Sequence, residues 1–286
     1  MFDFRYHALS LVAVFLALAI GILLGATIGE PVVSAAQEDL NRRLQRDLQD
    51  LSADRRDARA ELDGRDRLIQ EAYPMVAEGR LAGQRVTVVA TGALPGDVER
   101  SVRDAIEVAG GEVASTTELD LPADAARLGD AAGAQYADLE PDHPRLAALV
   151  RGTGASIVRG RGLAERLQDA LPDRFRGELE PADAVVLYRE PPAEGGDTPV
   201  RAGLEAELVD GLRAGGAPVV GVEQSDTDPS QVPFFEDVGV SSVDSVDLVG
   251  GRLALVLALD GGEGTFGFKG TAERALPELP LAGAGG

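Results

Sequence analysis

The chain of 286 residues is strongly acidic, with 48 aspartates and glutamates against 27 basic residues and a formal net charge of −21. A surface of this sign repels phosphate backbones, so nucleic-acid binding is excluded as a function. The chain has no cysteine, which excludes disulfides, zinc–thiolate sites and cysteine nucleophiles.

The N-terminal residues 1–30 predict a membrane anchor. Residues 8–28 carry no charge, and at about 1.5 Å per residue such a helix spans the roughly 30 Å hydrocarbon core of a bilayer. A buried core helix is one alternative, although the run lacks a polar stripe. A cleaved signal peptide is another, with a cut near Ala35, but the apolar run is longer than a signal peptide requires. Arg5 before the run weakly favours a cytoplasmic N-terminus and an extracytoplasmic C-terminal domain in the cell membrane.

Small residues recur at every fourth position of this anchor and would form one groove along a helix. They are Ala13, Ala17, Gly21, Gly25 and Gly29. This spacing lets two helix backbones approach closely, so it predicts a homodimer within the lipid. The alternative is that glycine and alanine are simply common in membrane helices.

Residues 31–80 predict a coiled-coil stalk. Pro31 is expected to break the anchor helix or to start a new one, and Pro74 is expected to end the stalk near Ala72. A heptad frame places apolar residues in one seam, which Arg55 and Arg65 interrupt. The apolar seam residues are Leu44, Leu48, Leu51, Ala58, Leu62 and Ile69. A single solvated helix is the alternative.

Residues 81–276 predict an α/β domain, and residues 277–286 a disordered tail. Apolar, β-branched runs alternate with amphipathic helical segments that end at glycines, as in βαβ units. The expected strands are 85–91, 112–116, 184–188, 218–223 and 242–246. We therefore predict a doubly wound, mostly parallel sheet of five strands with helices on both faces.

Two glycine-rich segments are candidate phosphate-binding loops, although neither has a known phosphate-binding spacing. The turn Gly92–Gly96 follows the first strand, and Gly261–Gly270 contains Lys269, the only lysine. For the second segment a flexible structural loop is the favoured interpretation. The chain also lacks a Gly-x-Ser-x-Gly nucleophile motif. We expect neither catalytic residues nor a bound cofactor, and therefore no enzyme.

The segment RYHALSLVAVFLALAIGILLG, from Arg5 to Gly25, resembles the start of the MctB family. The C-terminal run VDSVDLVGGRLALVLALDGGEGTFGFKG resembles the other signature of that family. Its members are actinobacterial envelope proteins named as copper transport proteins, and they are also described as the SteB-like component of a cell-separation complex. The order of anchor, coiled coil and α/β domain agrees as well.

This resemblance implies a role in copper homeostasis or efflux. The residues offer few copper ligands, because copper prefers thiolate, thioether and imidazole donors. His7, Met75 and His143 are the candidates, and a dimer would bring two copies of His7 together. The alternative function is an envelope scaffold that binds a partner protein controlling cell-wall hydrolysis and cell separation.

Overall fold

A computed structural model describes residues 4–136, 139–140, 142–193, 196, 198 and 199–278 of the chain. The chain divides into two compact units, Met1–Arg65 and Asp66–Gly286. The second unit begins inside the segment that the sequence assigned to the stalk. It contains the whole α/β domain, which we call the head.

Helix α1 is a single element, Phe4–Ala77. It passes through Pro31 and Pro74, so the predicted break at the first proline and the predicted end near Ala72 are both wrong. A proline inside a helix removes one backbone hydrogen bond. At Pro74 the loss is offset by tertiary packing, because the neighbouring Tyr73 and Ala77 are buried in the core of the head.

The first part of α1 is long and apolar enough to cross a membrane. The stretch Tyr6–Gly25 has 20 residues and a mean hydropathy of 2.7, and none of it is buried within the chain. Among the described residues it is the one helical stretch that meets these criteria of length and composition. The prediction of one N-terminal apolar helix is confirmed.

The head contains one sheet of seven strands in the order β3-β2-β1-β4-β5-β6-β7. All neighbouring strands pair in parallel except β2 and β3, which pair antiparallel. The strands are β1 (Arg85–Thr91), β2 (Glu112–Leu119), β3 (Phe175–Gly177), β4 (Ala184–Arg189), β5 (Val219–Val222), β6 (Ser241–Val243) and β7 (Thr265–Phe266). The doubly wound, mostly parallel arrangement agrees with the prediction.

The predicted number of five strands is too low, because both edge strands escape detection. The strand β3 has three residues and β7 has two, too few to show the alternation or the apolar run by which strands are recognised. The loop Gly261–Gly270, expected to be flexible, contains β7. Edge strands also pair on one side only, so their existence depends on the neighbouring strand.

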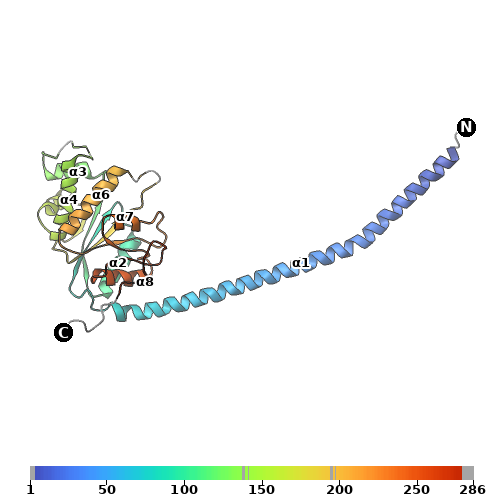
Figure 1. Cartoon of the computed structure of the whole chain (residues 1–286), viewed down its shortest axis with the longest axis horizontal. Helices are drawn as coiled ribbons and strands as arrows, with labels where there is room; N and C mark the ends of the chain where they lie inside the picture. The colour runs from blue at the N-terminus through green and yellow to red at the C-terminus, as the bar shows by residue number, and fades with distance from the viewer. Residues whose placement is uncertain (1–3, 137–138, 141, 194–195, 197, 279–286) are drawn as a thin grey trace. The chain divides into compact units, whose positions relative to one another are not determined.

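Helices cover both faces of the sheet (Figure 1). One face packs against α2 (Gly96–Val108), α8 (Val249–Leu259) and the last turns of α1. The other packs against the remaining helices. These are α3 (Ala125–Ala132), α4 (Pro144–Arg159), α5 (Leu163–Ala170), α6 (Pro199–Ala214) and α7 (Val232–Asp237). Burial of each leucine or valine in these layers contributes roughly 1.5–3 kcal/mol.

Part of the predicted disordered tail belongs to the head. Pro277 is buried, and Glu278 accepts a hydrogen bond from Arg274. The rest of that tail, residues 279–286, lies outside the described residues.

Candidate functional site at the carboxyl edge of the sheet

The candidate copper ligands lie on two different helices. His7 is exposed on α1, and Met75, on the last turn of α1, is 83 % exposed. His143 precedes α4, where its Nδ1 accepts a hydrogen bond from the backbone N–H of Arg145 at 3.1 Å and caps the helix. Within the described part of the chain, no group of three His, Cys, Asp or Glu side chains converges on a metal site. The cap explains His143 without a metal.

The predicted dimer residues whose burial the structure describes are exposed in the single chain. Along the stalk, Leu44, Leu48, Leu51 and Leu62 are each at least half exposed, and Ile69 is 36 % exposed. In the anchor, Ala13, Ala17, Gly21 and Gly25 are exposed. Gly29 and Ala58 are helical, but their side chains lie outside the described part of the chain. The apolar seam and the small-residue groove therefore remain open for a partner, and the dimer stays a prediction.

In doubly wound sheets, ligands bind where the strand order reverses, at the carboxyl ends of the strands. In this head that point lies between β1 and β4. The turn after β1 is the Gly92–Gly96 segment. In a phosphate-binding loop the backbone N–H groups of this turn would donate to the phosphate. The N–H of Ala93 donates instead to Glu190 at 3.0 Å, and that of Leu94 donates to Glu118 at 3.2 Å.

Gly92 makes this arrangement possible. Its φ is +105°, and a Cβ atom there would lie 2.2 Å from a carboxylate oxygen of Glu190. Two carboxylates of the chain thus fill the place where a phosphate would bind, and an incoming phosphate would meet like charge. The geometry does not fit a nucleotide cradle at this turn.

The loop after β4 is anchored by a buried arginine that the sequence analysis missed. Arg189, only 3 % exposed, donates from Nε to Glu205 at 2.7 Å and stacks 4.2 Å from the ring centre of Phe234. Glu205 also accepts from Arg201 at 2.9 Å, and Arg201 donates to the carbonyl of Glu190 at 2.7 Å. This network fixes the backbone beside the carboxylate of Glu190.

Two groups at this edge have shifted pKa values. A hydrogen bond from Gln224 lowers the pKa of Asp97, which lies in the first turn of α2. Burial raises the pKa of Tyr188 to about 12, and the negative charge of Glu190 acts in the same direction. At neutral pH the edge therefore carries the ionised carboxylate of Asp97 beside the neutral phenol of Tyr188.

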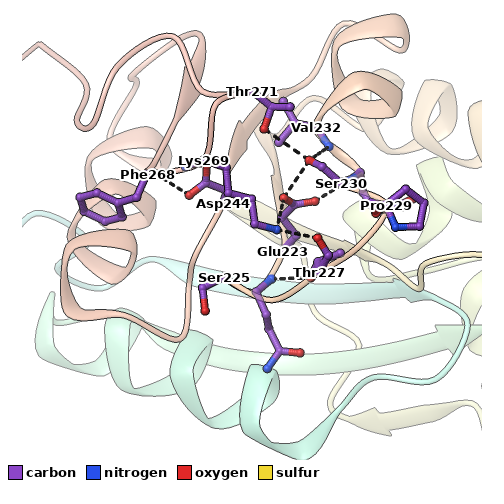
Figure 2. Close-up of polar contacts among 12 residues, drawn as sticks. Glu223, Ser225, Thr227, Pro229, Ser230, Val232, Asp244, Phe268, Lys269 and Thr271 are labelled. Carbon is purple, nitrogen blue, oxygen red and sulfur yellow. Dashed lines mark hydrogen bonds and ion pairs between the residues drawn. The ribbon is translucent and has the colours of Figure 1, made fainter. Parts of the chain in front are cut away.

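A second polar cluster lies at the carboxyl ends of β5, β6 and β7 (Figure 2). Lys269 donates from Nζ to Glu223 at 2.8 Å and to the carbonyl of Thr227 at 2.9 Å. The Glu223 side chain is fully buried and also accepts from the hydroxyl of Ser230 at 2.9 Å. The only lysine of the chain thus neutralises a carboxylate inside the head, which is a structural role.

Asp244 fixes the backbone of the segment that carries Lys269. Its two carboxylate oxygens accept from the backbone N–H groups of Phe268 at 2.7 Å and Lys269 at 2.9 Å. Gly267 has a φ of +138°, and a Cβ atom there would lie 1.9 Å from Asp244. We call these two hydrogen bonds the Asp244 clamp. The two side chains that follow it point in different directions: Lys269 points toward Glu223, whereas Phe268 points away from the cluster (Figure 2).

Phe268 is 53 % exposed and lines a groove of about 340 Å³ in the head. We call this the Phe268 groove. Its lining residues are Ile69, Gln70, Asp247, Leu248, Val249, Gly250, Arg252 and Phe268. A larger groove, of about 720 Å³, lies at the opposite edge, where β5, β6 and β7 begin, and its lining mixes glycines, small apolar residues and three glutamates.

The comparison with known families agrees with this architecture. The family model described as copper transport outer membrane protein, MctB, matches residues 1–277. The chain belongs to the MctB family. The search of curated proteins finds no match to the chain. The recognition made from the two sequence signatures is thereby confirmed, and the chain is a copper-transport-related membrane protein by family.

The C-terminal run that resembles a signature of the MctB family lies in the head. It runs from Val243, the last residue of β6, through α8 and β7 to Gly270, and it therefore supplies both Asp244 and Lys269. It also supplies most of the residues that line the Phe268 groove. The signature thus builds a rigid loop and an exposed apolar groove.

Proposed function

We propose that this MctB-family protein is a single-pass envelope protein of copper homeostasis, which works as a dimer with its acidic head outside the cytoplasm. The observation that carries the proposal is the exposed apolar stretch Tyr6–Gly25 at the start of a chain that matches the family over residues 1–277. Twenty apolar residues have the length that a bilayer core requires.

Anchoring and orientation are tested by protease protection. Intact cells are treated with a protease and probed for the head and for the N-terminus separately. We expect the protease to digest the head from outside, and we expect untreated cells to retain the intact chain in the membrane fraction. Recovery of the protein from the aqueous fraction, shortened near Ala35, would show a cleaved signal peptide and contradict the proposal.

We propose further that the copper role is exerted through a partner protein, and that the head does not carry the ion. The support is chemical, because the chain has no cysteine, two methionines and two histidines, and copper requires several such soft or imidazole donors together. His143 Nδ1 is already engaged as the cap of α4.

The copper test compares the native chain with a variant that carries His7→Ala, Met75→Ala and His143→Ala. We expect neither protein to show saturable uptake of Cu(I) or Cu(II) in calorimetry. We also expect the variant to restore intracellular copper levels as well as the native chain in cells that lack the protein. Saturable binding that disappears in the variant would instead establish direct copper handling.

The second candidate function is an envelope scaffold that binds a partner controlling cell-wall hydrolysis. The observation that favours it is the Phe268 groove beside a long helix, because exposed aromatic side chains in a groove are typical of protein-binding surfaces. The test is a pull-down with the full chain and with a deletion of residues 37–65, which leaves the second unit complete. We expect both proteins to capture the same partner, because the deletion keeps every residue that lines the Phe268 groove, whereas loss of the partner from the deletion would place the binding surface on the stalk instead.

A further inference from the structure

Leu68 is an exposed leucine that the coiled-coil seam does not explain. It is 67 % exposed and lies next to Ile69, a seam position. In the heptad frame it occupies position g, which precedes each a position and is usually charged. The earlier g positions are Asp47, Asp54 and Glu61. The chain therefore changes from acid to leucine at the last g position, where the stalk reaches the head.

This change coincides with the Phe268 groove. Ile69 lines that groove together with Leu248 and Phe268. In a parallel two-stranded coiled coil, a residue at position a inserts into a hole that includes the preceding g residue of the facing helix. Leu68 of a second copy is therefore one of the four residues that would surround Ile69, and the one at position g.

The groove itself offers apolar surface for that side chain. Leu248 is 46 % exposed and Phe268 is 53 % exposed, and the Asp244 clamp fixes the backbone that presents the phenyl ring. Leu68 of the same chain does not occupy the groove, because it is not among the residues that line it. Burying a leucine from water is favourable by roughly 1.5–3 kcal/mol.

We propose that Leu68 of a second copy of this chain inserts into the Phe268 groove and locks the two heads to the dimeric stalk. This inference rests on the dimer of the proposed function and adds a specific contact between helix α1 of one copy and the head of the other. The alternative occupants, a different protein or none, are outcomes of the test.

The test uses cross-linking of the full chain, which is favourable because the native protein has no cysteine. Two differently tagged copies are co-expressed, one with Leu68→Cys and the other with Leu248→Cys, and the membranes are treated with a short bis-maleimide. We expect a cross-linked product that carries both tags. The matched control pairs Leu68→Cys with Ala148→Cys, an exposed position on α4 at the other face of the sheet, and should give background only.

A separate cross-link distinguishes failure of the dimer from failure of the groove contact. Leu62→Cys, alone in both copies, reports on the seam itself and should give a dimer. If that product forms while Leu68→Cys with Leu248→Cys stays at the control level, the dimer stands and the groove contact is overturned. If neither product forms, the dimer fails and the contact fails with it.

Substitution gives an independent readout of the same contact. Leu68→Asp should weaken self-association of the detergent-extracted full chain about tenfold or more, because a charge replaces a buried leucine in both copies. Ala60→Asp adds the same charge at an outward f position and should change self-association less than about twofold. Equal effects of the two variants would overturn the proposal.

Discussion

Two apolar helical stretches of this protein have opposite environments. Helix α8 is almost entirely buried, with all of its residues from Leu253 to Leu259 in the core. The stretch Tyr6–Gly25 of α1 is entirely exposed within its own chain. Their lengths explain the difference, because the 11 residues of α8 extend only about 16 Å, roughly half of a bilayer core. The short apolar helix is covered by its own fold, whereas the long apolar stretch is not covered by the rest of the chain and has the length of a bilayer core.

The largest expected effect comes from placing the same charge in both stretches. Ala254→Asp introduces a carboxylate at a fully buried position of α8 and should cost more than about 4 kcal/mol, enough to unfold the head. Ala17→Asp should leave thermal unfolding of the head unchanged and should reduce membrane insertion by roughly 3 kcal/mol. Circular dichroism and membrane fractionation measure the two effects. A folded head in Ala254→Asp would remove the distinction between the stretches.

The next largest effect is expected from the buried ion pair between Lys269 and Glu223. Lys269→Met leaves the Glu223 carboxylate buried without its cation and should lower the free energy of unfolding by roughly 3–5 kcal/mol. Adding Glu223→Gln removes the unpaired charge and should recover much of the loss. Urea unfolding at neutral pH measures both variants. A loss that the double variant fails to recover would indicate that Lys269 acts through something other than this ion pair.

Tyr73 lies where α1 changes from an exposed helix to one buried against the head, and its hydroxyl reports on that burial. Burial raises its pKa to about 12 from an ordinary value of 10.0. Between these two values the unfolded chain ionises first, so rising pH favours unfolding, and stability that is present below pH 10 is lost by up to about 3 kcal/mol near pH 12. In Tyr73→Phe the free energy of unfolding should fall less between pH 10 and pH 12, by about the same 3 kcal/mol. Parallel pH profiles for the native chain and the variant would contradict the burial of this hydroxyl.

A small effect on the head is expected from the exposed seam of the stalk. Leu48 is 64 % exposed in the single chain, so Leu48→Ala should change the stability of the head by less than about 0.5 kcal/mol. The same variant should weaken self-association of the full chain, because a seam leucine packs between two helices. Light scattering over a concentration series measures the association. Unchanged association would favour the single solvated helix.

Local sequence patterns predicted the parts of the fold that depend on neighbouring residues. The run Arg85–Thr91 predicted β1, and the spacing of Val98, Val102 and Ile106 predicted α2 up to the glycine pair that follows. The candidate site was less predictable. The ion pair of Lys269 with Glu223 and that of Arg189 with Glu205 join residues far apart in the chain, and no local pattern marks which of the many acids will be paired.

The sequence by itself determined the apolar N-terminal helix and the doubly wound class of the head, because hydropathy and periodicity are local properties of the chain. Two characteristic segments of the sequence determined the family. Only the tertiary structure decided that α1 continues through Pro74, since burial of Tyr73 and Ala77 offsets the lost hydrogen bond. It also decided that carboxylates cap the turn after β1, because Glu118 reaches that turn from β2 and Glu190 reaches it from the residue that follows β4. Contacts of this kind depend on which strands the fold places side by side.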